Sequence, residues 1–537
     1  MNVRAVLSLL FVVAVALVLR IGDLAFRPLH NDEAINAVKL ERLWTTGEYR
    51  YDPHEYHGPA LYYLALPVAQ AAAWWRGLPG DGPDEAGMRW LAVLVGVALI
   101  LVPAFWVEGL GWRAWWISGL WLAVSPAFVY YSRYFIHELL LVFFAAMAIG
   151  AGCRYASRAS ALWAAVFGAS VGMMYATKET FVFSLLAMTL AAAGVLMWEG
   201  GSGDPNHPHG APRWRRIHDW LRWIPPWHAV IAIGSALAVW VVFFTSFFTH
   251  PGGALDSIQT YGIWLERAGG ASPHIHPWWF YWERLAWFKE RGGPLWTEAA
   301  VLAFAGVGAG FAVRATRMGN AERRIARFLV LYTVLLAAIY TVLPYKTPWC
   351  LLGFYHGAIL LAGLAVHGIL VRQRSAPMSV ATGLVVAAAV GHLGWQAWRA
   401  TRDYAADYRN PYVYGHTSAD IVNLLEQVRE VAAADPAGTQ VRLNVMAPDS
   451  NYWPLPWYLR DFGQVGWWDN VPEEPYAPIM VVASRLKADF EEKSKQAWLM
   501  VGMFELRPRY FVELYVEAGL WERFLAARRA ARDSGGG

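Results

Sequence analysis

Residues 90–107, WLAVLVGVALILVPAFWV, form an unbroken apolar run, and 115–131, WWISGLWLAVSPAFVYY, soon follows it. A helix needs ~20 such residues to cross the apolar core of a bilayer. Eleven runs reach or approach that length: 5–19, 90–107, 115–131, 139–153, 161–176, 181–198, 229–248, 299–313, 328–343, 349–371 and 380–397. We therefore expect a polytopic α-helical membrane protein with about eleven transmembrane helices.

The composition excludes a soluble globular enzyme. Of 537 residues, 57% are hydrophobic and 16% are charged, whereas soluble domains carry roughly 25% charged residues. The 31 tryptophans help to raise the aromatic share to 15%, which is typical of membrane interfaces and of sugar-binding clefts. The net charge of +4 is small, so no nucleic-acid partner is expected. Cys153 and Cys350 lack any metal-site spacing, and they imply neither a zinc site nor a disulfide.

The placement of arginines predicts the orientation in the cell membrane. Arginines gather in alternate loops, which the positive-inside rule assigns to the cytoplasm: Arg154, Arg158, Arg213, Arg215, Arg216, Arg222, Arg314, Arg317, Arg323, Arg324, Arg327, Arg372 and Arg374. The N-terminus with Arg4 is then cytoplasmic, and the long loop 21–89 lies outside. This requires that 59–75 dips into the interface and does not span, which Pro59, Pro67 and flanking aromatic residues favour.

The apolar periodicity stops after residue 397. We therefore expect a transmembrane domain over 1–397 and a small extracytoplasmic α/β domain over 398–537. Ile421, Leu424, Leu425 and Val428 follow helical spacing, and Thr417 or Ser418 could cap that helix. Short strand-like runs occur at 441–446, 479–483 and 498–504.

Polar clusters at the helix ends all fall on the predicted outer side: 30–34, 57–59, 132–138, 177–179 and 345–349. The short outer loops are otherwise poor in cations. Three cations nevertheless lie there, at the depth of a lipid phosphate: Arg133, Lys178 and Lys346. They are therefore predicted to bind an anion. The alternative is that their side chains merely reach toward bulk lipid head groups.

Asp32 and Glu33 are adjacent carboxylates after the first helix, and an amphipathic helical pattern follows them. They are the predicted catalytic residues, with Asp32 as the general base that accepts the proton of an attacking hydroxyl. Asp32 as an N-cap and Glu33 in a first helical turn would explain both residues structurally.

Four further groups accompany these candidates: His57, His137, Glu138 and Glu179. They could orient the carboxylates or hold a divalent metal such as Mg or Mn, although their spacing matches no established metal motif. Glu138 and Glu179 could instead neutralise Arg133 and Lys178 as ion pairs. Aromatic residues that could contact a sugar or an acceptor are Tyr62, Tyr63, Trp349, Trp453 and Trp457; anchoring at the interface or core packing is the alternative.

Six motifs carry a resemblance to a known family: HNDEA (30–34), YHGPALYY (56–63), ATKE (176–179), YKTPW (345–349), PYVYGHTS (411–418) and WPLPWYLR (453–460). Together they resemble the predicted glycosyltransferases labelled flippase-activity-associated, within the GT-C superfamily. Protein mannosyltransferases and the aminoarabinose transferases of lipid A share the same plan more distantly.

The resemblance implies an enzyme that uses a polyprenyl-phosphate-linked sugar as donor and a glycan, lipid or protein as acceptor. It also implies that Asp32 is the base, that Glu33 supports it, and that the three cations above bind the donor phosphate. Two other functions stay open: an accessory or flippase-like protein that handles lipid-linked glycans without bond cleavage, and a glycan-binding module on an inactive membrane scaffold.

Overall fold

The computed structural model describes residues 3–55, 57–78, 80, 82–106, 111–198, 222–268, 274–314, 318–373 and 375–534. It divides into two compact units. The membrane unit comprises Met1–Leu24, Arg42–Ala405 and Arg409–Tyr412, and the C-terminal unit comprises Ala25–Glu41, Ala406–Tyr408 and Val413–Gly537. The boundary at residue 397 expected from the sequence stays a prediction, and the C-terminal unit also includes Ala25–Glu41.

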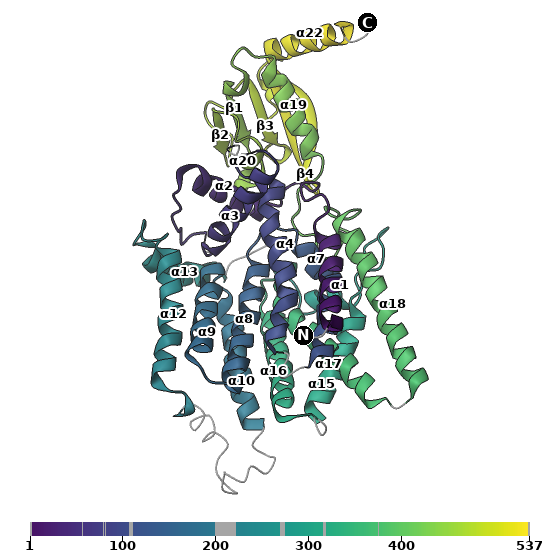
Figure 1. Cartoon of the computed structure of the whole chain (residues 1–537). Coiled ribbons are helices and arrows are strands. Elements are labelled where there is room, and N and C mark those ends of the chain that lie inside the picture. Colours follow the sequence, from purple (N-terminus) through teal and green to yellow (C-terminus); the bar gives the residue numbers. More distant parts are fainter. Residues whose placement is uncertain are drawn as a thin grey trace. The chain divides into compact units, whose positions relative to one another are not determined.

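The membrane unit is built of helices (Figure 1). They are α1 (Val3–Arg20), α3 (Ala60–Trp75), α4 (Glu85–Leu101), α6 (Trp112–Val124), α7 (Pro126–Tyr131), α8 (Glu138–Ser157), α9 (Ala161–Thr177), α10 (Phe181–Trp198), α12 (Pro226–Phe244), α13 (Gly253–Ala268), α14 (Phe280–Ala286), α15 (Ala299–Arg314), α16 (Asn320–Val342), α17 (Leu352–Arg372) and α18 (Ala376–Thr401).

The apolar runs fall on these helices. Among the described residues, seven helical segments are long and apolar enough to cross a membrane, and three shorter apolar helices match the runs at 5–19, 161–176 and 299–313. The polytopic helical fold is thus confirmed. The membrane depth of α3 and the orientation stay predictions. Among the arginines used for that orientation, Arg213, Arg215, Arg216, Arg317 and Arg374 lie outside the described residues.

The remaining run, 115–131, is divided at Ser125 into α6 and α7. The Ser125 side chain accepts a hydrogen bond from the backbone of Phe128, and Pro126 occupies the first position of α7. A proline lacks the N–H that would continue a helix, but its fixed φ suits a helix start. The break therefore follows directly from the Ser–Pro step.

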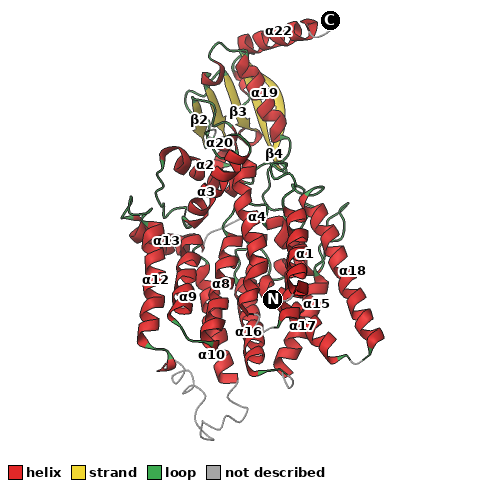
Figure 2. Cartoon of the chain, viewed as in Figure 1, coloured by secondary structure: helices red, strands yellow, loops and turns green. Residues whose placement is uncertain are grey.

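The C-terminal unit holds all the strands that the structure describes (Figure 2). They are β1 (Leu443–Met446), β2 (Val465–Trp468), β3 (Ile479–Ala483), β4 (Trp498–Arg507) and β5 (Tyr510–Glu517), in the sheet order β2-β1-β3-β5-β4. Strand β1 is parallel to β2 and β3, whereas β5 is antiparallel to β3 and β4. The helices of this unit are the start of α2 (Asn31–Thr46), α19 (Ile421–Ala433), α20 (Leu455–Tyr458), α21 (Phe490–Lys493) and α22 (Ala518–Ser534).

Apolar side chains of α19, α22 and one sheet face form the main core of this unit, with Val428, Leu443 and Leu520 among its fully buried members. The expected helix and three strands are confirmed as α19, β1, β3 and β4. Of the two expected caps, Thr417 is wrong, because its hydroxyl donates to the Leu29 carbonyl instead. The Ser418 hydroxyl accepts a hydrogen bond from the backbone N–H of Asp420 at 3.3 Å, directly before α19. Strands β2 and β5 were not expected.

Candidate active site

The acidic pair begins helix α2, where the two carboxylates have different surroundings. Glu33 is fully buried, and its carboxylate accepts hydrogen bonds from the backbone N–H of His30 at 2.9 Å and from the Arg27 guanidinium at 2.6 Å. A carboxylate that reaches back three residues to a helix-initiating N–H is one half of a capping box. Glu33 therefore stabilises the first turn of α2 and neutralises the buried charge of Arg27.

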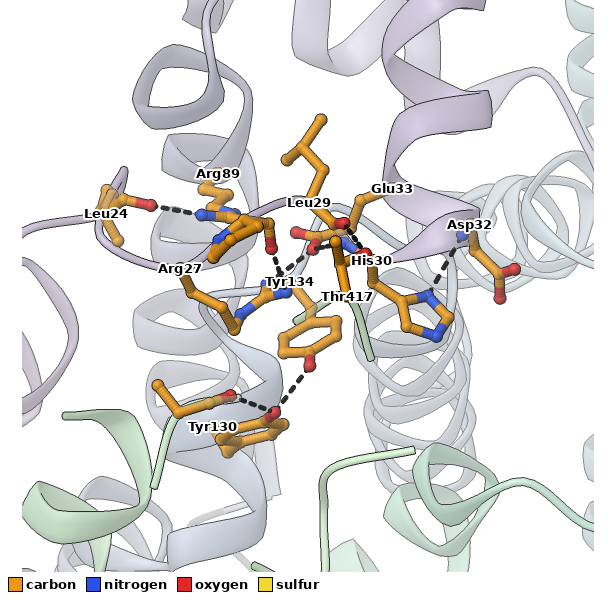
Figure 3. A network of polar contacts seen from close by, with 12 residues as sticks. Leu24, Arg27, Leu29, His30, Asp32, Glu33, Arg89, Tyr130, Tyr134 and Thr417 are labelled. Atoms are coloured by element: carbon orange, nitrogen blue, oxygen red, sulfur yellow. Dashed lines mark hydrogen bonds and ion pairs between the residues drawn. The ribbon is translucent and has the colours of Figure 1, made fainter. Parts of the chain in front are cut away.

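The Asp32 carboxylate is half-buried and points away from the Arg27–Glu33 pair (Figure 3). The backbone N–H of Asp32 donates to His30 Nδ1 at 3.1 Å. No hydrogen bond from the described part of the chain reaches its carboxylate. Burial lowers the pKa of Arg507, and the charges of Tyr510 and Asp32 partly offset that effect. Asp32 thus has an accessible carboxylate within the electrostatic influence of a cation.

In the membrane unit, three predicted outer segments meet. His57 and Lys178 form an isolated antiparallel bridge, and the Gly58 N–H donates to the Thr177 carbonyl at 3.1 Å. A Cβ on residue 58 would lie 2.1 Å from the carbonyl oxygen of Ala176, so only glycine permits this approach. Gly58, which precedes Pro59, therefore lets the loop 21–89 pack onto the end of α9.

Four polar side chains gather at this junction in two pairs. The Lys178 ammonium forms a buried ion pair with Glu138, and His57 Nδ1 lies 3.0 Å from Glu179 Oε2. The centroid of the His137 ring lies 4.8 Å from that of His57, with the two rings tilted by 54°, and His137 Nε2 lies 3.2 Å from the Gly58 carbonyl. The sequence predicted His57, His137, Glu138 and Glu179 as one set and placed Lys178 among the phosphate ligands, whereas the structure brings all five side chains together. Arg133 and Lys178 were the expected ion-pair partners of the two carboxylates, and the structure pairs them with Lys178 and His57.

Electrostatics stabilises the charged state of this cluster. Burial lowers the pKa of Lys178, but the charges of Glu138 and Glu179 outweigh it and hold that pKa well above its ordinary value. Burial raises the pKa of Glu179, but the charge and hydrogen bond of His57 together with Lys178 bring it below its ordinary value. This environment therefore favours the charged ammonium form of Lys178.

The predicted Mg or Mn site does not fit these side chains as they stand. Among the described residues no three His, Cys, Asp or Glu side chains converge well enough to hold an ion. Lys178 occupies the position beside Glu138 that a metal cation would need, and His57 engages Glu179.

The other two predicted phosphate ligands lie at helix C-termini. The Arg133 guanidinium donates to the carbonyls of Arg20, Gly22 and Asp23, at and just beyond the end of α1. The Lys346 ammonium donates to the Leu343 carbonyl at the end of α16, and burial lowers its pKa. Cations are favourable at these ends because the last carbonyls of a helix lack partners. These contacts give both residues a structural function, and phosphate binding by them stays a prediction.

Most of the predicted sugar-contacting aromatic residues are covered. Three are buried, with side chains 0%, 6% and 0% exposed: Tyr62, Trp349 and Trp457. The Arg460 guanidinium lies 3.8 Å above the Trp457 ring. Because neighbouring side chains cover their rings, these three offer no open face for stacking. Tyr63 and Trp453 keep part of their surface exposed.

Sequence reasoning missed a buried carboxylate, Glu298, directly before α15. It accepts hydrogen bonds from Ser125 Oγ at 2.6 Å, Tyr355 Oη at 2.6 Å, Tyr412 Oη at 2.5 Å and the Ala127 N–H at 3.0 Å. Four neutral donors thus satisfy one buried acid and connect three helices to the segment after α18. The only signal in the sequence is a lone acid directly before the apolar run 299–313.

The chain is similar to known proteins in sequence over one region and in fold over most of its length. Residues 78–205 match the model of the dolichyl-phosphate-mannose-protein mannosyltransferase family, whereas no curated protein sequence matches the chain. The fold is similar to that of the Archaeoglobus fulgidus oligosaccharyltransferase tethered with an acceptor peptide, with 12% identity, a TM-score of 0.56, and 97% of this chain and 77% of that chain covered. The same oligosaccharyltransferase has also been solved in complex with Zn and sulfate.

Two further solved structures share the fold. ArnT from Cupriavidus metallidurans bound to undecaprenyl phosphate is 15% identical, with a TM-score of 0.56 over 95% of this chain and 98% of that chain. The S. cerevisiae Pmt1–Pmt2 complex bound to the sugar donor is 11% identical, with a TM-score of 0.55 over 80% of this chain and 92% of that chain. This chain is therefore a polytopic helical membrane protein with a GT-C-like fold and a small C-terminal sheet domain.

Proposed function

We propose that this protein is a GT-C glycosyltransferase of the flippase-activity-associated group, which transfers a sugar from a polyprenyl-phosphate-linked donor to an acceptor. The reaction takes place at the extracytoplasmic face of the cell membrane. The acceptor is a glycan, a lipid or a protein. Asp32 is the base, and Lys178, with Arg133 and Lys346, stabilises the departing phosphate.

The reaction is a displacement at the anomeric carbon. The acceptor hydroxyl attacks that carbon, and its proton passes to the Asp32 carboxylate. The bond between the anomeric carbon and the donor oxygen breaks, and the electron pair leaves with the lipid phosphate. A fixed cation stabilises the negative charge that develops on the leaving group, more strongly in a site with little water.

The contrast between the two adjacent acids is the observation that carries this proposal. Glu33 is buried and engaged by Arg27 and by the His30 N–H, whereas no described hydrogen bond reaches the Asp32 carboxylate. A general base needs an oxygen that can accept the proton of a bound substrate, so Asp32 suits that function and Glu33 does not. The environment that favours the charged form of Lys178 supports the second half of the reaction, in which the phosphate leaves.

Release of polyprenyl phosphate by the purified protein in lipid nanodiscs tests the proposal. The donor is a polyprenyl-phosphate sugar, and the acceptor is a crude fraction from the cell membranes in which the protein occurs. The free lipid phosphate is then measured. Asp32→Asn should lower the rate by about 10²- to 10⁴-fold, the usual contribution of a general base, without changing the thermal unfolding midpoint. Full turnover by Asp32→Asn would contradict the proposed mechanism.

The same assay separates transfer from an accessory or flippase-like function. A protein that only moves lipid-linked glycans would change their leaflet and leave the sugar–phosphate bond intact. Appearance of free lipid phosphate that depends on Asp32 supports transfer. Translocation of the lipid-linked glycan without cleavage of the sugar–phosphate bond would contradict transfer and support the accessory function.

Orientation is tested separately in intact cells. In a variant without Cys153 and Cys350, a cysteine is placed at Glu48, an exposed position in the loop 21–89. An impermeant thiol reagent should label it, because we propose that this loop is extracytoplasmic. Protection of that cysteine in intact cells, with labelling after lysis, would reverse the orientation.

A further inference from the structure

The proposed base is part of the same compact unit as the C-terminal sheet. Ala25–Glu41, which includes Asp32, groups with Val413–Gly537 and not with the helices that flank it in the sequence. This segment lies some four hundred residues before the sheet in the sequence. Tertiary contacts, and not chain connectivity, must therefore hold it there.

Three contacts attach the segment on either side of Asp32. The Thr417 hydroxyl donates to the Leu29 carbonyl at 2.7 Å, and the Leu29 N–H donates to the Tyr458 hydroxyl at 2.8 Å. Further along α2, Glu41 pairs with Arg460 at 3.1 Å. The motifs PYVYGHTS and WPLPWYLR thus supply the residues that hold the acidic segment.

Arg507, at the end of β4, makes the contact nearest to the proposed base. Its guanidinium donates to Asn31 Oδ1 at 3.3 Å, to Asn451 Oδ1 at 2.9 Å and to the Trp453 carbonyl at 2.5 Å. Asn31 directly precedes Asp32, whose charge offsets part of the lowering of the Arg507 pKa by burial. One rigid planar group therefore connects the sheet, the Trp453 loop and the first turn of α2.

We propose that Arg507 is a positioning residue that fixes the first turn of α2 and thereby aims the Asp32 carboxylate at the acceptor. The C-terminal domain is then a functional part of the active site and not an appended module. This inference rests on the proposed function, because it assigns Arg507 a consequence for the reaction that Asp32 performs. A misplaced base costs rate because the reacting groups no longer meet in a productive geometry.

The test compares Arg507→Met, Arg507→Lys and the control Arg509→Met in the full-length protein. Arg509 is exposed and two residues away, and its backbone N–H donates to the Glu505 carboxylate at 2.9 Å. Arg507→Met should lower kcat about 10- to 100-fold, with KM for the lipid donor changed by less than about twofold. Arg507→Lys should recover part of kcat, since it keeps the charge, and Arg509→Met should match wild type.

Amide hydrogen exchange of residues 31–35 gives a readout that does not need turnover. Arg507→Met should speed exchange in this turn and leave β1 and β3 unchanged. Unchanged exchange at 31–35, or wild-type kcat in Arg507→Met, would overturn the positioning function. If Arg507→Met fails to fold, Asn31→Ala removes the same contact from the other side. If Asp32→Asn proves fully active, the proposed function fails while the exchange result still decides whether Arg507 orders α2.

Discussion

The Glu33 carboxylate lies 2.6 Å from the Arg27 guanidinium and accepts a hydrogen bond from the backbone N–H of His30. Both partners of this ion pair are buried, with side chains 0% and 8% exposed. The neighbouring Asp32 carboxylate points elsewhere (Figure 3). Two adjacent acids in one helical turn therefore have different functions, and substitution should separate them.

Glu33→Gln should destabilise the C-terminal unit, because it leaves the charge of Arg27 buried without its carboxylate. Breaking a buried ion pair costs about 3–5 kcal/mol. Thermal unfolding of the purified protein should show the loss, whereas Asp32→Asn should unfold at the wild-type temperature. Equal midpoints for the two variants would contradict the structural function of Glu33.

Lys178→Met should destabilise the membrane unit by about 3–5 kcal/mol, since it strands the buried Glu138 carboxylate. The double variant Lys178→Met/Glu138→Gln removes both charges and should recover most of that stability. Its lipid-phosphate release should stay low if Lys178 binds the donor phosphate. Recovery of full activity together with stability would show that the ion pair only supports the fold.

Glu298→Ala should lower the free energy of unfolding of the membrane unit by at least about 3 kcal/mol. The substitution leaves four buried donors without an acceptor, and each costs roughly 1–3 kcal/mol. Glu298→Gln keeps the volume and one acceptor oxygen, so its effect should be smaller. Calorimetry in nanodiscs ranks the three proteins, and an unchanged midpoint for Glu298→Ala would contradict the network.

The C-terminal unit should lose stability in mild acid. His416 is 6% exposed, and burial, with a further contribution from His30, lowers its pKa to about 4 from an ordinary value of 6.5. Because the folded state disfavours protonation, its stabilising contribution is complete above pH 6.5 and declines as the pH falls toward 4. At pH 5 the contribution of His416 to the free energy of unfolding is lower by about 2 kcal/mol.

Hydrogen exchange of β1 and β3 at pH 7.5 and pH 5, corrected for intrinsic rates, measures that loss. His30 adds to it in the same direction, because burial also lowers its pKa. His416→Gln should remove part of the pH dependence. If His416→Gln keeps the pH dependence of the wild type, other titratable groups cause the loss of stability.

Much of the fold could be predicted from local patterns. The apolar runs predicted the membrane helices, and alternating or continuous apolar residues predicted α19, β1, β3 and β4. Strand β2 was missed because Val465–Trp468 is short and contains a glycine, which weakens its strand pattern. Its pairing with β1 decides its conformation.

The candidate site was predictable only in part. The sequence identified His57, His137, Glu138 and Glu179 as one set, because polar residues at the ends of apolar helices are costly and need partners, but it assigned Lys178 to a different set. It could not choose Glu138 as the partner of Lys178, since forty residues separate them and the choice depends on how α8 and α9 pack. It also offered Trp457 as an exposed ring, which the fold buries.

The sequence by itself determined where the chain enters the membrane and which residue types stand at the helix ends, since desolvation of an apolar run and the cost of a buried charge are local properties. Only the tertiary structure decided that Glu33 is engaged while Asp32 stays accessible. It also decided that the segment carrying both is held by Thr417, Tyr458 and Arg507. Hydrogen bonds between such distant segments depend on three-dimensional packing, and no periodicity along the chain encodes them.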